Sequence, residues 1–320
     1  MRLSEELQDA IADEAASVER SALVRAAQEL SAQYQRGDFR SAALPTDAHR
    51  IAYLQTRLPA TYAANAHAFA AIKECMAGVE LKSLLDLGAG PGTSMWAAAA
   101  AFPGIRRITA VERDPALLAL GRRLAARNPN ESVRTGKWVR ADIAAYSPDA
   151  HDLVVLSYAL GELFRPEAII ARAWQATHKL LVIVDPGTPR NFQHVLAARA
   201  WLIGAGAHLV APCPHHNLCP LAMAGDWCHF AERVERTAEH RRMKGGTLGY
   251  EDEKFSYMAA ARSAVTWPRA RILRHPQFHS GHVQLTLCTA LGLQRQTVGK
   301  SQKDVYRAAR RARWGDAWEY

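Results

Sequence analysis

Long apolar runs are missing from this sequence, since no stretch approaches the roughly 20 apolar residues that cross a bilayer, and the alanine run at 97–101 is far shorter. A secretory signal is also missing, because acidic residues occur within the first nine positions and no apolar segment follows them. Mitochondrial transit peptides avoid acidic residues, so this start is not typical of one. We therefore expect a cytoplasmic protein that does not enter a membrane.

Cysteine is scarce, with five in 320 residues, and no pair has the short spacing of a structural zinc hairpin. Cys213, Cys219 and Cys228 fall within sixteen residues, and Cys288 follows after 59 more. Wide spacing, with proline directly after two of the cysteines, favours four thiolates around a [4Fe–4S] cluster. Zinc remains an alternative, bound by cysteine together with His215, His216 or His229, and so do plain buried thiols. Cys75 is expected to be an inert core thiol.

The charge is unevenly distributed along the chain. The net charge is +9, and residues 190–320 account for all of it, with 19 lysines and arginines against 10 acidic residues. A basic excess attracts polyanions, although a solvated basic surface without a partner is the alternative. The aromatic residues Tyr306 and Trp314 are candidates to stack on bases. The candidate RNA-binding residues are Arg241, Arg242, Lys244, Lys300, Arg307, Arg310, Arg311 and Arg313.

Apolar periodicity divides the chain into three parts. Helical patterns dominate the first 78 residues. Short β-rich runs then alternate with helical segments, which predicts a parallel sheet with helices on both faces. We expect an N-terminal helical segment (1–78), a Rossmann core (79–205) and a C-terminal extension (206–320) with the cysteines, remaining strands and a basic tail. The expected strands are 83–87, 107–111, 137–140, 153–157, 180–184, 233–237, 255–259 and 283–288, and a basic helix is expected at 304–318.

A glycine-rich loop follows the first expected strand and reads Asp-Leu-Gly-Ala-Gly-Pro-Gly-Thr over residues 86–93. Glycines allow the backbone to turn tightly and a ligand to approach it closely. The helix behind the loop presents the positive end of its dipole to that ligand. Asp86 is suited to order the loop and contact the amino-acid end of the ligand, Glu112 to bind ribose hydroxyls, and Asp142 to contact adenine. Three acids in this order resemble the class I S-adenosylmethionine-dependent methyltransferases. The expected cofactor residues are Asp86, Gly88, Ala89, Gly90, Gly92, Thr93, Glu112, Asp142 and Ser157.

A catalytic residue is harder to find. The Asn/Asp-Pro-Pro-Tyr/Phe loop of many amino-methylating enzymes is absent after the fourth expected strand, where residues 156–163 read Leu-Ser-Tyr-Ala-Leu-Gly-Glu-Leu. Tyr158 and Glu162 are the candidates there, and either could equally be a pocket wall or a loop cap. Methyl transfer can proceed by positioning alone. A Rossmann domain that has lost its ligand is the alternative.

Several segments together resemble the small-ribosomal-subunit methyltransferase-like family (the Rsm-twenty-two family), namely 157–163, 184–189, 206–215, 227–230, 244–257 and 300–314. The resemblance covers roughly residues 80–316. It implies a class I methyltransferase-like fold, S-adenosylmethionine, a role at the small ribosomal subunit and its RNA, and a [4Fe–4S] site at Cys213, Cys219, Cys228 and Cys288. The chain would be a bacterial-type member. A catalytically inactive assembly factor and an iron- or redox-responsive RNA-binding switch are the alternative functions.

Overall fold

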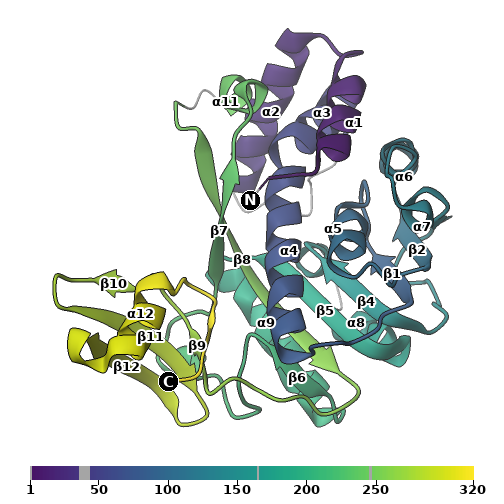
Figure 1. Ribbon diagram of the computed structural model, residues 1–320. Helices are drawn as coiled ribbons and strands as arrows, with labels where there is room; N and C mark the ends of the chain where they lie inside the picture. Colours follow the sequence, from purple (N-terminus) through teal and green to yellow (C-terminus); the bar gives the residue numbers. More distant parts are fainter. Residues whose placement is uncertain (1, 36–43, 164–165, 245–246) are drawn as a thin grey trace.

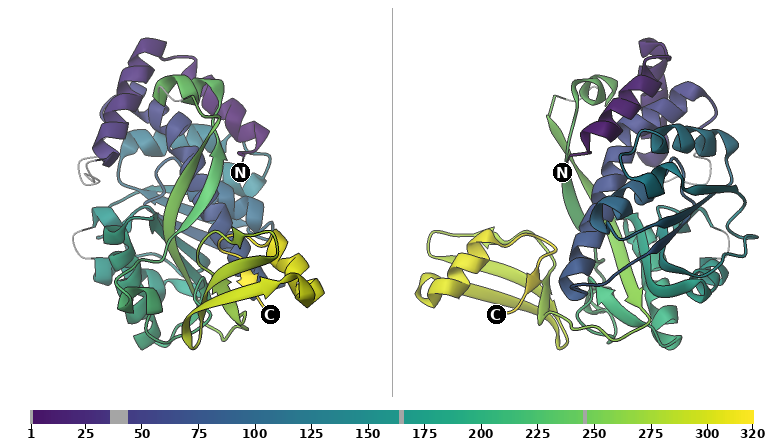
Figure 2. Two further views of the ribbon diagram at one scale, coloured as in Figure 1. Left: turned by 90° about the vertical axis from the view of Figure 1, so that its left-hand side faces the viewer. Right: turned by 45° about the vertical axis from the view of Figure 1, so that its right-hand side comes forward.

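The computed structural model describes residues 2–35, 44–163, 166–244 and 247–320. A large α/β body carries a helical bundle at one end and a smaller β-rich lobe at its side (Figure 1). The two further views show the lobe standing beside the main sheet and away from the first three N-terminal helices (Figure 2). No helix of the described chain is both long enough and apolar enough to span a bilayer.

The N-terminal helices pack against the main body through α4. Thr46 caps α3, accepting a hydrogen bond from the His49 amide at 3.4 Å. Helix α4 buries Phe69 and Ile72 and packs against strands of the central sheet. The four helices are α1 (Glu5–Ala15), α2 (Arg20–Gln35), α3 (Asp47–Thr56) and α4 (Leu58–Cys75).

The central sheet has the order β3-β2-β1-β4-β5-β8-β6. The first five strands run parallel, and β8 is antiparallel between β5 and β6. Strand β1 is buried at all five positions, as expected for a parallel strand that is covered on both faces. The strands are β1 (Ser83–Leu87), β2 (Arg107–Glu112), β3 (Lys137–Arg140), β4 (His151–Ser157), β5 (Thr177–Pro186), β6 (His208–Ala211) and β8 (Tyr250–Ala261).

Helices connect these strands and cover the sheet: α5 (Thr93–Ala101), α6 (Pro115–Ala125), α7 (Glu131–Arg134), η1 (Leu160–Glu162), α8 (Pro166–Gln175) and α9 (Pro189–Gly204). The strand order and the alternation of strands with helices confirm the expected α/β methyltransferase-like fold. Because β1, β2 and β4 are parallel, their carboxyl ends meet at one edge of the sheet. Ligands of open α/β sheets bind at that edge.

A long hairpin extends the sheet toward the N-terminal helices. Strand β7 (Phe230–Glu235) pairs with the first half of β8, and α11 (Ala238–Lys244) at the hairpin end packs against α2 (Figure 1). The expected strands 233–237 and 255–259 are therefore parts of a longer β ribbon. The ribbon places β8 in contact with both the sheet and the helical bundle.

The C-terminal lobe is a second, five-stranded sheet around a core that includes Ile272, Leu285 and Val298. Short helix α10 (Pro220–Met223) precedes it in the cysteine-containing connection. The expected basic helix 304–318 ends earlier, at Arg311, because Ala312 is extended with ψ 146°, and the chain then turns at Gly315 with φ 96°. The elements are β9 (Ala270–Ile272), β10 (Gln277–Phe278), β11 (His282–Thr289), β12 (Gly292–Gly299), η2 (Lys300–Gln302), α12 (Lys303–Arg311) and β13 (Ala317–Trp318).

Candidate functional site

The glycine-rich loop joins β1 to α5 and requires glycine at three positions. Gly88, Gly90 and Gly92 have φ angles of 75°, 55° and 88°, in the left-handed region where a side chain is strained. A Cβ on Gly88 would lie 3.2 Å from the Cβ of Ala159. The loop therefore packs closely against the segment that follows β4.

Glu112 fixes this loop to the end of β2. Its Oε2 accepts a hydrogen bond from the Gly90 amide at 2.8 Å, and its Oε1 accepts one from the Asp114 amide at 2.8 Å. The carboxylate still borders the pocket. Glu112 thus performs the loop-ordering role that the sequence suggested for Asp86.

Asp86 lies behind the loop and does not border the pocket. Its side chain is fully buried. Within the described residues, neither carboxyl oxygen has a partner at ordinary hydrogen-bond geometry. Burial raises the pKa of Asp86 to about 7, with the nearby Glu112 charge adding to the effect, while Ser94 and Met95 at the start of α5 oppose it.

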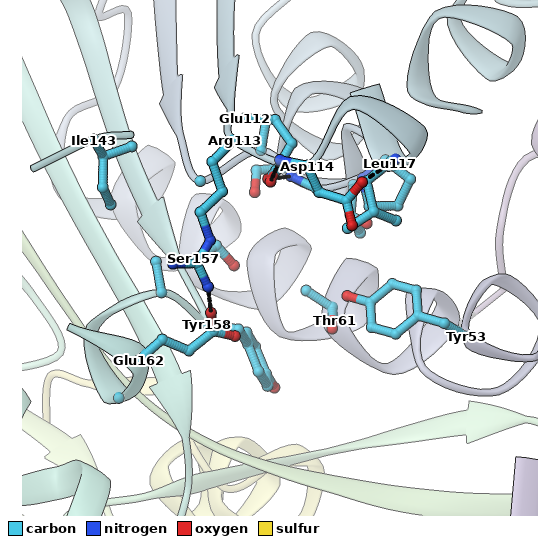
Figure 3. A pocket seen from close by; sticks show the side chains of 18 of the residues that line it. Tyr53, Thr61, Glu112, Arg113, Asp114, Leu117, Ile143, Ser157, Tyr158 and Glu162 are labelled. Carbon is cyan, nitrogen blue, oxygen red and sulfur yellow. Dashed lines mark hydrogen bonds and ion pairs between the residues drawn. The ribbon is translucent and has the colours of Figure 1, made fainter. Parts of the chain in front are cut away.

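A pocket of about 320 Å³ opens at this edge of the sheet (Figure 3), a volume within the range of small-molecule sites. Gly88, Ala89, Gly90, Thr93, Glu112, Asp142 and Ser157 all line it, whereas Gly92 stands behind them as the N-cap of α5. The Ser157 hydroxyl accepts a 2.8 Å hydrogen bond from Asn65 of α4. Asp142 is exposed, and its Oδ1 accepts from the Ala144 amide at 2.8 Å. The structure brings these predicted cofactor residues together, apart from Asp86 and Gly92.

The N-terminal helices supply a wall of the pocket that the sequence did not reveal. Tyr53, Arg57 and Thr61 line it from α3, α4 and the junction between them. Arg57 donates to both oxygens of Glu253 on β8, at 3.2 and 3.0 Å. No local motif marks these residues, because they meet the loop only through the tertiary fold.

The catalytic candidate Tyr158 joins this same group. It has a φ of 56°, and its hydroxyl donates to Glu253 Oε1 at 2.7 Å. Burial, followed by the Glu253 charge, raises the pKa of Tyr158 well above its ordinary value. Tyr158 is therefore a protonated side chain in the pocket wall, fixed by its hydrogen bond to Glu253.

Glu162 stands at the pocket rim on the opposite side of the opening from Thr61 and Tyr53 (Figure 3). Its Oε2 lies 3.6 Å from the Arg113 guanidinium, and 42% of its side chain is exposed. Burial raises the pKa of Glu162 to about 7 against the influence of Arg113, and the charges of Glu112 and Asp185 add to the rise. Glu162 can therefore exchange a proton near neutral pH.

The four expected ligand cysteines converge on one small cavity, although they come from distant parts of the chain. Cys213, Cys219, Cys228 and Cys288 line it together with His215 and Leu273. Burial raises the pKa of Cys213, Cys228 and Cys288, that of Cys288 to about 12. Within the described residues, however, no group of three or more His, Cys, Asp or Glu side chains is arranged to hold a metal ion.

The histidines near this cavity differ in placement. His215 Nε2 lies 3.3 Å from Cys288 Sγ. His216 accepts a hydrogen bond from the Leu209 amide at 3.0 Å and packs against Trp267, and His229 stacks on Trp227. Of the three histidines considered for zinc, His215 is the one that borders the cavity.

Two buried arginines hold the cysteine-containing connection. Arg199 on α9 donates to the carbonyls of His215 and Asn217 at 3.1 and 2.7 Å. Arg271 on β9 donates to the carbonyls of Pro212 and Gly315 at 3.2 and 2.9 Å. The connection is thus fixed both to the main body and to the lobe.

The expected RNA-binding residues fall into two separate groups. Arg241 and Arg242 lie on α11 near the helical bundle, and the side chain of Lys244 lies outside the described part. Lys300, Arg307, Arg310, Arg311 and Arg313 are exposed on the C-terminal lobe. Figures 1 and 2 place α11 and α12 at distant ends of the molecule.

The two aromatic residues expected to stack on bases pack inward. Tyr306 lies against the lobe core, and Trp314 lies against His229 and His275 with its indole nitrogen buried. Both residues are half-buried, so each ring is partly used in packing.

Comparison with known proteins identifies the family. The family described as "Mitochondrial small ribosomal subunit Rsm22" matches residues 47–319. The human "Ribosome assembly protein METTL17, mitochondrial" is 27% identical over 296 residues, which cover 85% of this chain and 62% of that protein. The Schizosaccharomyces pombe "Rsm22-cox11 tandem protein 2, mitochondrial" is 27% identical over 331 residues, with 85% and 43% covered. The chain thus spans less than two thirds of either relative.

Solved structures that resemble the chain include magnesium protoporphyrin IX methyltransferase from Synechocystis PCC 6803 with bound SAM, at 12% identity and a TM-score of 0.41, covering 64% of this chain and 80% of that one. The plantazolicin methyltransferase BpumL in complex with SAH has 10% identity and a TM-score of 0.39, covering 80% of this chain and 99% of that one. Because the family match extends over most of the chain, from the start of α3 to the residue after the last strand, the chain belongs to the Rsm22 family.

Proposed function

We propose that the pocket beneath the glycine-rich loop binds S-adenosylmethionine, and that the chain acts on or near small-subunit ribosomal RNA during ribosome assembly or translation. The observation that carries the first part is the convergence of two positive-φ glycines, Gly88 and Gly90, with Glu112 and Asp142 around one cavity. The second part is supported by membership of a family described by a small ribosomal subunit protein. The expected cytoplasmic location stays a prediction.

The residues present fit this cofactor. Backbone approach at Gly88 and Gly90 suits the amino-acid end, Glu112 suits ribose hydroxyls, and Asp142 suits the adenine amine. When bound, S-adenosylmethionine supplies an electrophilic methyl group. The chain's own contribution is to orient the acceptor and exclude water, which can accelerate such a transfer by positioning. Glu162 could take up a proton from the acceptor, because its pKa lies near neutrality.

A non-catalytic assembly factor is the second candidate, and a specific contact favours it. The Tyr158 hydroxyl is committed to Glu253, which is itself paired with Arg57. No Asn/Asp-Pro-Pro-Tyr/Phe segment follows β4 to clamp an acceptor amine. In this alternative the cofactor pocket stabilises a conformation that binds RNA, and methyl transfer does not occur.

Calorimetric titration of the full chain with S-adenosylmethionine tests the cofactor proposal. Gly90→Ala should abolish binding, whereas Gly78→Ala is a matched control. Both glycines have positive φ and open space where a Cβ would stand, but Gly78 lies outside the pocket. No heat of binding to the wild-type chain, or equal loss in both variants, would contradict the proposal. Co-sedimentation with small ribosomal subunits tests the partner.

We also propose that Cys213, Cys219, Cys228 and Cys288 hold a [4Fe–4S] cluster, with zinc as the alternative. Four thiols around one cavity supply the donor set of such a cluster, and burial keeps Cys213, Cys228 and Cys288 protonated unless a bound cation stabilises the thiolates. The cluster would tie the 213–228 connection to β11.

Anaerobic purification followed by iron, sulfide and zinc analysis distinguishes the possibilities. About four irons and four sulfides per chain are expected, with loss in Cys219→Ser and no loss in Cys75→Ser, because Cys75 lies outside the cavity. One zinc without sulfide would refute the cluster and leave a zinc site. If neither metal is found, the four cysteines are free thiols around the cavity.

A further inference from the structure

An exposed group of rings and cations occupies one end of the C-terminal lobe. Phe278 on β10 is 51% exposed, and the guanidinium of Arg310 lies over its ring, 5.0 Å from the centroid. His279 in the adjoining turn stacks on His282 at the start of β11, with centroids 4.4 Å apart and an interplanar angle of 15°. These side chains come from β10, the β10–β11 turn, β11 and α12.

Lys300 belongs to the same group. Its amide donates to the Gly281 carbonyl at 3.1 Å, so the β10–β11 turn and the start of η2 lie together. We refer to Phe278, His279, His282, Lys300 and Arg310 as the stacking platform. Asp304 on α12 forms an ion pair with Arg307. Arg310, one turn further along the helix, is the cation that faces the Phe278 ring.

A single exposed apolar side chain is common on protein surfaces and has no meaning by itself. Phe278 differs because a cation lies over its ring, two stacked imidazoles adjoin it and a further lysine borders the turn. Rings that stack bases beside cations that attract phosphates are the means by which proteins hold unpaired nucleotides. A duplex hides its base faces and could use only the cations.

We propose that the stacking platform binds an unpaired base in single-stranded RNA, with Phe278 as the ring on which the base stacks and Arg310 and Lys300 facing the backbone phosphates. The choice of RNA rests on the function proposed above. Phe278 is more exposed than the expected stacking residues Tyr306 and Trp314, which are half-buried. Through the platform, the C-terminal lobe binds unpaired segments of RNA.

Fluorescence anisotropy with a labelled 12-nucleotide single strand and a duplex of the same sequence tests this proposal on the full chain. Phe278→Leu should weaken single-strand binding about tenfold with little effect on the duplex, and Phe278→Trp should restore it. Arg310→Gln should lower the slope of log affinity against log salt by about 0.7, whereas Phe278→Leu should leave the slope unchanged. Leu291→Ala is the control, since Leu291 is 89% exposed beyond the opposite end of β11.

Unchanged single-strand affinity in Phe278→Leu, equal losses for single strand and duplex, or no RNA binding by the wild-type chain would each overturn the platform. Co-sedimentation with small subunits separates this result from the proposed function. Phe278-dependent binding of the oligonucleotide without co-sedimentation would retain the platform and contradict the ribosomal role. Co-sedimentation of a chain whose RNA affinity does not depend on Phe278 would support the ribosomal role and overturn the platform.

Discussion

At the scale of single residues, Trp138 links the cofactor loop to helix α6. A Cβ placed on Gly92 would lie 3.0 Å from the Trp138 ring, and one on Gly121 would lie only 2.2 Å from it. The indole thus fills the space between two glycines, one in the loop and one in the helix. The glycine in α6 serves packing, although alanine is the better helix former by about 1 kcal/mol.

We predict that Gly121→Ala lowers the free energy of unfolding by about 1–3 kcal/mol, because overpacking against a buried ring outweighs the gain in helix propensity. Affinity for S-adenosylmethionine should fall as well, since a displaced Trp138 presses on Gly92. Urea denaturation measures the first effect. Gly204→Ala at the end of α9, where nothing lies within 4 Å of the new Cβ, should be neutral or stabilising. An equal loss in both variants would refute this packing argument.

A second residue-scale prediction concerns Asp86, whose pKa is about 7 in the folded chain against an ordinary value of 3.8. The folded state then holds a proton that the unfolded chain releases. The favourable contribution of Asp86 to the free energy of unfolding is therefore complete below pH 3.8 and is lost as the pH rises to about 7. Asp86→Asn should remove this decline, which amounts to at most about 4 kcal/mol. Unfolding midpoints from pH 4 to 8 that fall in parallel for both chains would argue against it.

Local sequence predicted one side of the pocket and missed the other. The loop, Glu112 and Asp142 follow successive strands, so strand order alone brings them together. Arg57 and Glu253 are 196 positions apart and pair because α4 crosses β8. Asp86 occupies the position usual for a loop acid, yet burial removes it from the cavity, and burial cannot be read from a motif.

At the scale of elements, Arg271 joins three segments that do not pair as strands with one another. From β9 it donates to Pro212 before the cysteine cavity, to Gly315 in the last turn and to Glu74 at the end of α4, at 3.2, 2.9 and 3.2 Å. The side chain is 1% exposed. The lobe is therefore attached to the main body by a buried charge as well as by the chain.

We predict that Arg271→Met destabilises the chain by about 3 kcal/mol, because buried carbonyls lose charge-assisted hydrogen bonds. Protease susceptibility between residues 262 and 269 should rise at the same time. Arg269→Met provides the control, since Arg269 is exposed two residues earlier. Equal melting temperatures for the two variants would show that Arg271 is dispensable.

Periodicity identified the long elements better than the short ones. Strands β1, β2, β4 and β5 are apolar throughout their centres and were expected within a few residues of their observed bounds. Strands β9, β10 and β13 have two or three residues each, too few for any alternation to appear. The expected helix over 304–318 was too long because Arg313 continues the arginine pattern past Arg311, where the helix ends and Ala312 is extended.

At the scale of the whole molecule, the basic excess is divided between the hairpin end and the C-terminal lobe. Arg241 and Arg242 lie at α11, and Arg307, Arg310 and Arg311 lie on α12. The β7–β8 ribbon runs from the α11 group toward the lobe that carries the α12 group (Figures 1 and 2). A partner that contacts both groups must be large, as a folded ribosomal RNA is.

We predict independent contributions from the two groups. Replacing the three α12 arginines with glutamine should lower the salt slope of RNA affinity by about 2, and replacing Arg241 and Arg242 should lower it by about 1.4. The combined variant should show the sum, because distant sites add. Anisotropy with a small-subunit RNA fragment over a salt series measures the slopes. A combined slope no lower than that of the α12 variant would mean that α11 does not contact this RNA.

The place of β8 in the sheet has a consequence for synthesis on the ribosome. Strands β3-β2-β1-β4-β5 are complete once residue 186 has been made, and they pair with one another without help from later segments. Strand β6 is made next, but its neighbour in the sheet is β8, which ends at residue 261. The nascent chain must therefore carry β6 unpaired while about fifty further residues emerge, and Cys213, Cys219 and Cys228 wait longer still, until β11 supplies Cys288 and completes their cavity.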